Sequence, residues 1–115
     1  MNLQQAKDFV TRWLDAANSH ELEQIMSFYA PDAVVESPFV VELMNEPTGR
    51  IKGEAALRAY FGKGVKTYSL HLIEAAWGAN SISAWYANNK GTRTHAYLEI
   101  GKDGKITRNV SHYNA

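Results

Sequence analysis

Two sets of residues in this sequence could carry chemistry: a polar pair at the end of a short predicted strand, and four histidines. The segment YAPDAVVESPF, residues 29–39, places Glu36 and Ser37 directly before Pro38. Successive side chains of a strand point to opposite faces, so these two side chains diverge. A serine hydroxyl can donate or accept a hydrogen bond, but it is not a base unless a partner activates it. Ser37 is therefore expected to bind a ligand rather than to take a proton.

Histidine is the side chain whose ordinary pKa suits proton transfer near neutral pH. His20 lies at a predicted helix start, and strand alternation turns His95 and His112 outward. His71 is the open case, because strand 68–77 can present either of its two faces to the interior. The apolar pattern favours the face that leaves His71 outside. That face carries Leu70, Leu72 and Ala76.

The composition argues against several classes of function. Twelve basic and twelve acidic residues cancel, so the chain has no large electrostatic field to attract nucleic acid. The chain has no cysteine, which rules out disulfides, thiolate metal sites and a cysteine nucleophile. No two histidines lie close in sequence, and no carboxylates cluster with them at ligand spacing. We therefore expect no metal ion and no cofactor.

The hydropathy of the chain bears on its location. No apolar run approaches the ~20 residues of a membrane span. The N-terminal residues MNLQQAKDF do not form a basic and then apolar signal peptide. The lack of cysteine also fits a reducing compartment. We therefore expect a cytoplasmic protein that does not contact membranes.

The first half of the chain has the periodicity of amphipathic helices. Apolar residues repeat at three- and four-residue steps over residues 3–17, and Asn2 is placed to cap this helix. Another short helix, EAALRAYF, follows Gly53. The sequence thus predicts a helical layer built mainly from the N-terminal half.

A second helix and a short strand are predicted between these two helices. Ser19 or His20 would cap the helix, and Tyr29 would lie on its apolar face. Pro31 would end it, since proline breaks a helix interior. Residues 33–37 then form the short strand that ends in the polar pair.

The second half changes to the pattern of strands. Residues 68–77, 81–89, 93–100 and 105–113 are rich in Ile, Leu, Trp, Tyr and Thr and are joined by short turns with Gly, Asn or Asp. Short turns join antiparallel neighbours, so the four strands form a meander. Helices followed by an antiparallel sheet give an α+β fold, in a single domain over residues 1–115.

Residues 38–52 form a long connection that is more apolar than a solvated loop. The segment PFVVELMNEPTGRIK could be a lid over a pocket. Alternatively, its apolar side chains cover an edge of the core. These side chains belong to Phe39, Val40, Val41, Leu43 and Met44.

Several motifs together resemble the SnoaL-like branch of the nuclear transport factor 2-like superfamily, over nearly the whole chain. The resemblance implies a cone-shaped, curved antiparallel sheet with three N-terminal helices, the nuclear transport factor 2-like or cystatin-like α+β barrel. It also implies a homodimer through the outer sheet face, which Trp85, His95, Tyr97 and Glu99 would suit. The motifs are Trp13 with Asn18, Glu21 with Leu22, YAPDAVVESP, and Gly53-x-x-Ala56-Leu57-x-x-Tyr60-Phe61.

The resemblance does not settle the reaction. Members of the superfamily include ketosteroid isomerases, polyketide cyclases, limonene epoxide hydrolases, dehydratases and proteins that only bind or assemble. Ser37 stands where the isomerases carry an aspartate base. Trp13 stands at their oxyanion-hole tyrosine, and Ala96 lies near their protonated aspartate. Function must therefore be argued from the site.

The resemblance implies that Ser37 lies on the face of the strand that lines a cavity. Glu36 would then point away from the cavity and form a surface ion pair. Alternation then turns Asn109, Ser111 and Tyr113 inward from the last strand. The resulting pocket is aromatic with neutral polar groups, as small-molecule sites often are. The predicted ligand-binding residues are Trp13, Tyr29, Ser37, Tyr60, Tyr86, Asn88, Leu98, Asn109 and Ser111.

Two classes of function follow. In the first, the pocket holds a small apolar molecule and catalyses proton transfer, as an isomerase, cyclase or dehydratase. Alignment with the family turns His71 inward as the base, and Tyr113, Tyr60 or Asn109 would polarise a carbonyl. In the second, the protein is a non-catalytic binding or assembly module, which the lack of inward aspartates favours.

Overall fold

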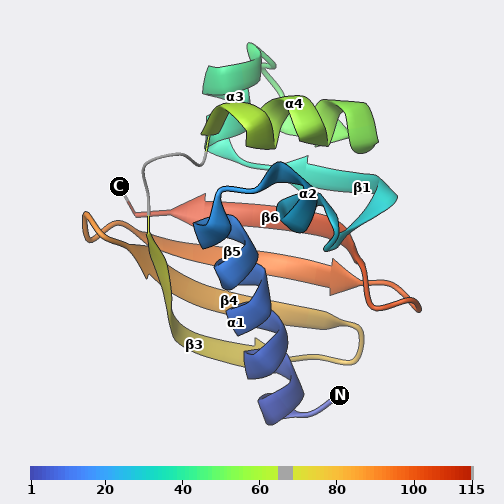
Figure 1. The fold of residues 1–115 in the computed structure, drawn as a ribbon, viewed down its shortest axis with the longest axis vertical. Helices are drawn as coiled ribbons and strands as arrows, with labels where there is room; N and C mark the ends of the chain where they lie inside the picture. The colour runs from blue at the N-terminus through green and yellow to red at the C-terminus, as the bar shows by residue number, and fades with distance from the viewer. Residues whose placement is uncertain (65–68, 115) are drawn as a thin grey trace.

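The strands form one curved, unclosed sheet, and the helices lie across one face of it and at one end (Figure 1). The structure is a computed structural model and describes residues 1–64 and 69–114. The expected α+β fold is confirmed, with one helix more than predicted. In chain order the elements are α1 (Leu3–Ser19), α2 (Leu22–Met26), β1 (Tyr29–Glu36), α3 (Pro38–Met44), β2 (Arg50–Lys52), α4 (Glu54–Gly64), β3 (Leu70–Trp77), β4 (Ser81–Asn88), β5 (Arg93–Ile100) and β6 (Ile106–Tyr113).

The strand order is β2-β1-β6-β5-β4-β3. Strands β3 to β6 form the predicted meander. Each pairs antiparallel with the next strand along the chain. The last strand, β6, then pairs in parallel with β1, and β1 pairs antiparallel with β2. Tyr68, the predicted first residue of the meander, lies outside the described residues.

Helix α1 forms as predicted and lies across the sheet, where it packs against β3 (Figure 1). The Asn2 side chain accepts a hydrogen bond from the Gln5 backbone N–H at 2.9 Å, and the Gln5 side chain accepts one from the Asn2 N–H at 2.8 Å. This reciprocal capping box satisfies two N–H groups that a helix start leaves unpaired. The apolar face it orients buries Val10, Trp13 and Leu14. No helix in the described part of the chain is long and apolar enough to cross a membrane.

The predicted end of the second helix is wrong. Helix α2 stops at Met26, and Tyr29 is the first residue of β1 rather than part of a helical face. Pro31 lies inside β1, where the pairing register with β6 shifts between Tyr29 and Val34. Proline has no N–H to give to a ladder, so it fits such an irregularity. The backbone pairing of β1 with β6 therefore overrides the helical spacing of the side chains.

The start of α2 also differs from the prediction. Its N-cap residue is Glu21, which makes no side-chain capping bond. His20 instead ends α1 in a left-handed conformation with φ 59°. The Ser19 hydroxyl accepts a hydrogen bond from the Glu21 N–H at 3.1 Å. Ser19 thus supports the turn between the helices and does not cap the second one.

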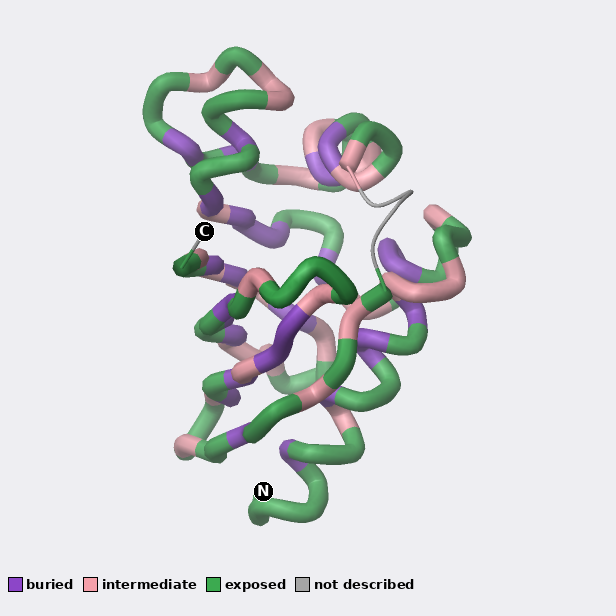
Figure 2. Tube along the Cα trace, turned by 90° about the vertical axis from the view of Figure 1, so that its left-hand side faces the viewer, coloured by how far each residue is buried: buried purple, intermediate pink, exposed green. Residues whose placement is uncertain are grey.

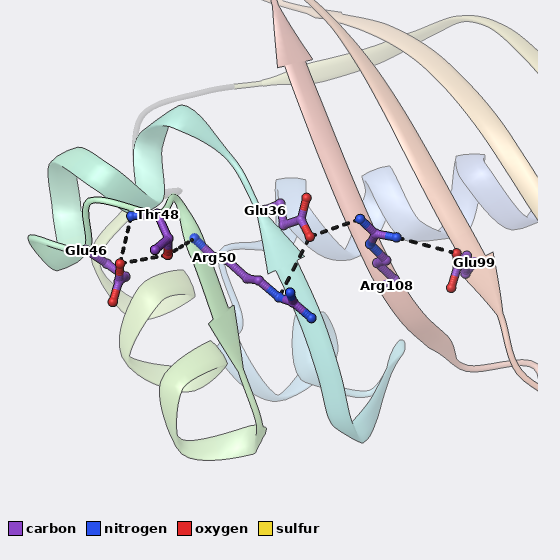
Figure 3. Close-up of polar contacts among 6 residues, drawn as sticks. All are labelled: Glu36, Glu46, Thr48, Arg50, Glu99 and Arg108. Carbon is purple, nitrogen blue, oxygen red and sulfur yellow. Dashed lines mark hydrogen bonds and ion pairs between the residues drawn. The ribbon is translucent and has the colours of Figure 1, made fainter.

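Residues 38–52 are ordered secondary structure rather than an open connection. The Ser37 hydroxyl caps α3 by accepting a hydrogen bond from the Phe39 N–H at 3.1 Å, and proline opens the helix. Val40 on this helix is fully buried, which supports the interpretation that the segment covers an edge of the core. After α3, the Glu46 carboxylate accepts hydrogen bonds from Thr48 and turns the chain into β2 (Figure 3).

Buried and exposed residues alternate along the strands, so the sheet has two distinct faces (Figure 2). On the outer face, charged side chains alternate across four strands (Figure 3). The Glu36 carboxylate lies 3.0 Å from an Arg108 nitrogen and 3.8 Å from an Arg50 nitrogen, and Arg108 lies 3.9 Å from Glu99. The prediction that Glu36 points away from the interior into a surface pair is confirmed.

Candidate functional site

A cavity of about 580 Å³ lies between α1, α3, α4 and the inner face of the sheet. Its volume falls within the roughly 300–1,000 Å³ typical of small-molecule sites. The lining brings together eight of the residues predicted from the sequence, from helices and strands far apart in the chain. These are Trp13, Tyr29, Tyr60, Tyr86, Asn88, Asn109, Ser111 and Tyr113.

Three predicted site residues lie elsewhere. Leu98 is fully buried in the hydrophobic core and does not line the cavity. Ser37 is buried but its hydroxyl caps α3, so it supports the wall rather than forming it. His71 is exposed on β3, where Leu70 and Leu72 turn inward. The family alignment that turned His71 inward is wrong. The apolar pattern of that strand is correct for Leu70 and Leu72 but wrong for Ala76, because an irregularity after Leu72 exposes Ala76 and buries Ala75.

The structure adds lining residues that the sequence analysis missed. Phe39 and Leu43 come from α3, and their four-residue spacing is a helical signal within an apolar run. Thr94 precedes Ala96 and Leu98 on the same face of β5, so strand alternation could have identified it. Phe61 packs on Tyr29 with ring centroids 5.1 Å apart. No local pattern distinguishes Phe61 from an ordinary core residue.

A buried chain of hydrogen bonds lines one wall of the cavity. Ser111 Oγ donates to Asn109 Oδ1 at 3.0 Å, and Asn109 Nδ2 donates to the Tyr29 hydroxyl at 3.1 Å. Trp13 Nε1 donates to the same hydroxyl at 3.3 Å. Parallel pairing of β1 with β6 brings these groups together, since it sets Val35 beside Asn109. These groups are far apart in sequence, because β1 is the first strand of the described chain and β6 is the last.

Four tyrosines belong to the described cavity lining, and these cavity tyrosines are uncharged at neutral pH. Burial raises the pKa of Tyr29 to about 12, although its hydrogen bonds from Asn109 and Trp13 oppose the shift. Burial also raises the pKa of Tyr60, Tyr86 and Tyr113 above the ordinary value. A buried phenolate would lose its hydration without gaining a cation, so the protonated form persists. Each hydroxyl can therefore donate a hydrogen bond.

A second group of hydroxyls lies near α3. The Ser37 hydroxyl is a hydrogen-bond partner that lowers the pKa of both Tyr60 and Tyr113, against the larger effect of burial. The Phe39 ring packs edge-on against Tyr113 with centroids 4.6 Å apart. Helix α3 thus packs Phe39 against the last residue of β6 and contributes an aromatic side chain to this side of the cavity.

Among the described residues, formal charge in the cavity lining is carried only by exposed side chains. Glu42 on α3 and Lys63 on α4 are exposed lining residues, and Lys63 Nζ donates to the Leu43 carbonyl at 3.3 Å. No aspartate or histidine belongs to the described lining. Within residues 1–64 and 69–114, no three His, Asp or Glu side chains gather at a spacing that could hold a metal ion. The interior of the cavity is therefore neutral and rich in hydroxyl groups.

A larger but more open hollow, about 710 Å³, lies between α1 and the turn from β5 to β6. Several of its polar groups already have partners: Lys105 Nζ donates to the Ser27 carbonyl, and Gln5 belongs to the capping box of α1. Its aromatic residues, Phe9 and Phe28, pack against each other with centroids 5.7 Å apart. The less open cavity between α1, α3, α4 and the sheet is therefore the better candidate site.

The chain is similar to proteins of one family. The SnoaL-like domain family matches residues 10–109. A solved SnoaL-like protein of unknown function from Burkholderia thailandensis E264 has a TM-score of 0.88 and 28% identity, over 96% of this chain and 94% of that chain. No curated protein matches the chain.

Two more distant structures show the fold alone. A putative ketosteroid isomerase from Kribbella flavida DSM 17836 has a TM-score of 0.75 and 16% identity, over 98% of this chain and 80% of that chain. SalBIII, an epoxide hydrolase/cyclase-like enzyme with a role in pyran ring formation in the polyether salinomycin, has a TM-score of 0.74 and 18% identity. That match covers 96% of this chain and 92% of the SalBIII chain.

The raised pKa of Tyr29 predicts a loss of stability in alkali. In the unfolded chain a tyrosine ionises near pH 10, whereas Tyr29 in the fold ionises near pH 12. Its contribution to the free energy of unfolding is full below about pH 10 and is lost as the pH rises through about 12. Urea unfolding of the wild type and Tyr29→Phe at several pH values measures this, with Tyr97→Phe as the matched control. A Tyr29→Phe curve parallel to that of the wild type between pH 9 and pH 12 would contradict the assignment.

Proposed function

We propose, because the chain belongs to the SnoaL-like domain family, that its cavity binds a small, mostly apolar molecule. The observation that carries the proposal is the cavity of about 580 Å³, which is walled by aromatic and aliphatic side chains with neutral hydroxyl and amide groups among them. Apolar ligand surface buried there contributes about 25 cal/mol per Å². The hydroxyl and amide groups would orient the ligand.

The electrostatics favour a neutral ligand. The four cavity tyrosines stay protonated at neutral pH, and Glu42 and Lys63 lie at the mouth. A charged group carried into the interior would lose hydration without meeting an opposite charge, at a large cost. SalBIII and the putative ketosteroid isomerase have names that refer to small-molecule chemistry, which supports a small-molecule site in this fold.

Binding of a neutral bicyclic hydrocarbon tests this proposal. Tetralin is expected to bind the wild type, as followed by tryptophan fluorescence and calorimetry, because Trp13 lies in the cavity wall. Ala17→Phe fills part of the cavity and is expected to weaken binding by about tenfold or more, equivalent to the loss of roughly two buried methylene groups. Ala55→Phe makes the same change at an exposed position of α4 and should leave binding unchanged. Failure of tetralin to bind the wild type at millimolar concentration would refute the proposal.

A second candidate is catalysis by proton transfer, as an isomerase, cyclase or dehydratase. Glu42 favours it, because it places a carboxylate in the described cavity lining, on α3. A carboxylate at the mouth can accept a proton from a carbon next to a carbonyl. His71, the base predicted from the sequence, is on the exposed side of β3 and cannot take this part. Tyr113 remains the predicted group that polarises the carbonyl, and we keep it here as a proposal.

Deuterium exchange at the carbon next to the carbonyl of 1-tetralone measures this proton transfer. The wild type is expected to accelerate exchange in D₂O, as followed by NMR, and Glu42→Gln to slow it by about 10²-fold or more, as for loss of a general base. Glu21→Gln is the matched control, since Glu21 is exposed and its side chain makes no capping bond. Exchange at the wild-type rate in Glu42→Gln would exclude Glu42. Tetralin binding without any acceleration of exchange by the wild type would favour the alternative, a non-catalytic binding or assembly module.

The outer sheet face supports a proposal about assembly. Tyr97 there is 39% exposed, and on the same face Trp85 packs against His95 with ring centroids 4.5 Å apart. We propose that this face pairs with a second copy to form a homodimer, which would cover these apolar side chains. We also propose that residues 1–115 act as one domain in the cytoplasm, in keeping with the cysteine-free sequence.

Light scattering during size-exclusion chromatography tests the dimer. The wild type is expected to elute with twice the 12.9 kDa mass of the chain. Tyr97→Glu should shift it to the monomer, because a charge would then be buried without a partner. Leu3→Glu changes an exposed apolar side chain of α1 and should remain dimeric. A wild-type monomer at tens of micromolar would contradict the proposal.

A further inference from the structure

We propose that Tyr29 makes the cavity selective for ligands that carry a hydrogen-bond acceptor, of which a carbonyl on an apolar skeleton is the chemical class that fits best. The inference rests on the proposed binding function and adds the residue that selects the ligand. It gives a β1 residue the part of carbonyl hydrogen-bond donor, which the sequence analysis gave to Tyr113, Tyr60 or Asn109.

The argument begins with the hydrogen bonds at the Tyr29 oxygen. A phenolic hydroxyl has one proton to donate and an oxygen that accepts. Trp13 Nε1 can only donate, and it lies 3.3 Å from this oxygen. Asn109 Nδ2 is also a donor and lies 3.1 Å away. The oxygen of Tyr29 is therefore occupied by two incoming hydrogen bonds.

The orientation of the Asn109 amide is set by its other neighbour. Ser111 Oγ donates to Asn109 Oδ1 at 3.0 Å, so the amide oxygen faces the serine and the amide nitrogen faces Tyr29. The chain from Ser111 to Tyr29 thus runs in one direction, each group donating to the next. Hydrogen bonds in such a chain polarise one another and strengthen the donor at its end.

The Tyr29 hydroxyl is the last group in this series of hydrogen bonds. Within residues 1–64 and 69–114, no side chain or carbonyl accepts its proton. The hydroxyl is secluded: Tyr29 is 6% exposed, Trp13 8% and Asn109 4%. All three side chains line the cavity, so a ligand there can supply the missing acceptor. Burial keeps this group protonated, since its pKa is raised to about 12.

The other cavity tyrosines differ from Tyr29 in this respect. Tyr60 and Tyr113 have the Ser37 hydroxyl as a hydrogen-bond partner, and Tyr86 has the Thr94 hydroxyl. A hydroxyl partner can accept the tyrosine proton, whereas the N–H groups of Trp13 and Asn109 cannot. Among the cavity tyrosines of the described residues, Tyr29 therefore differs in that both of its hydrogen-bond partners are donors.

This arrangement discriminates between ligands in a definite direction. A ketone offers only acceptor lone pairs, so it completes the hydrogen bonding of Tyr29. A hydrocarbon leaves the buried donor unpaired, which is costly. An alcohol can accept the proton, but its own O–H finds the oxygen of Tyr29 already occupied by Trp13 and Asn109. The expected order of affinity is ketone, then alcohol, then hydrocarbon.

Three ligands with the same skeleton test the inference: 1-tetralone, 1-tetralol and tetralin. Calorimetry on the wild type should show 1-tetralone binding about fivefold tighter than tetralin, the effect of one net hydrogen bond. The infrared carbonyl stretch of ¹³C-labelled 1-tetralone should move to lower frequency on binding than in cyclohexane. Tyr29→Phe should abolish the shift and leave tetralin binding in place. Tyr97→Phe removes a hydroxyl from the outer face and should retain the shift.

A second variant tests the lone-pair argument without removing the tyrosine. Trp13→Phe removes one incoming hydrogen bond and frees a lone pair on Tyr29, so affinity for 1-tetralol should rise relative to 1-tetralone. The wild-type spectrum decides the question even if Tyr29→Phe unfolds. Binding of 1-tetralone with an unshifted carbonyl stretch would overturn this inference alone. Failure of all three ligands to bind would overturn the proposed function and the inference with it.

Discussion

The parallel pairing of β1 with β6 is the interaction on which the rest of the structure depends. It joins the first strand of the chain to the last, and the Ile106 N–H donates to the Phe28 carbonyl at 2.8 Å where the two strands begin to pair. Through it, the helices near the N-terminus are held over the C-terminal meander (Figure 1). The cavity exists because of this pairing, since Tyr29 comes from one strand and Asn109 from the other.

The two faces of the sheet have different physical characters. The outer face carries the alternating charges of Arg50, Glu36, Arg108 and Glu99, which remain partly hydrated and contribute little each to stability (Figure 3). The inner face carries tyrosine, threonine, serine and asparagine side chains that bond to one another. A one-residue slip in register would exchange these faces, so the buried apolar residues that set the register also preserve the chemistry of the cavity.

The cavity interior is polar without being charged, and this distinguishes it from an acid–base site built on inward carboxylates. Hydroxyl and amide groups can satisfy each other in a low-dielectric interior, whereas an isolated carboxylate would be costly there. The N-cap role of Ser37 belongs to the same pattern: at the tip of β1, a hydroxyl starts α3 and so places Phe39 against Tyr113. Ser37 thus both starts α3 and, through that helix, fixes one side of the cavity.

The sequence by itself determined the elements whose causes are local. The cap at Asn2, the apolar spacing of α1 and the turns of the meander each involve a few neighbouring residues, and all were predictable. Only the tertiary structure decided the place of Tyr29, whose spacing fits a helix but whose backbone pairs with β6. Likewise, only the tertiary structure gives the direction of its hydroxyl proton, because the groups that set it, Trp13 and Asn109, lie 16 and 80 residues away along the chain.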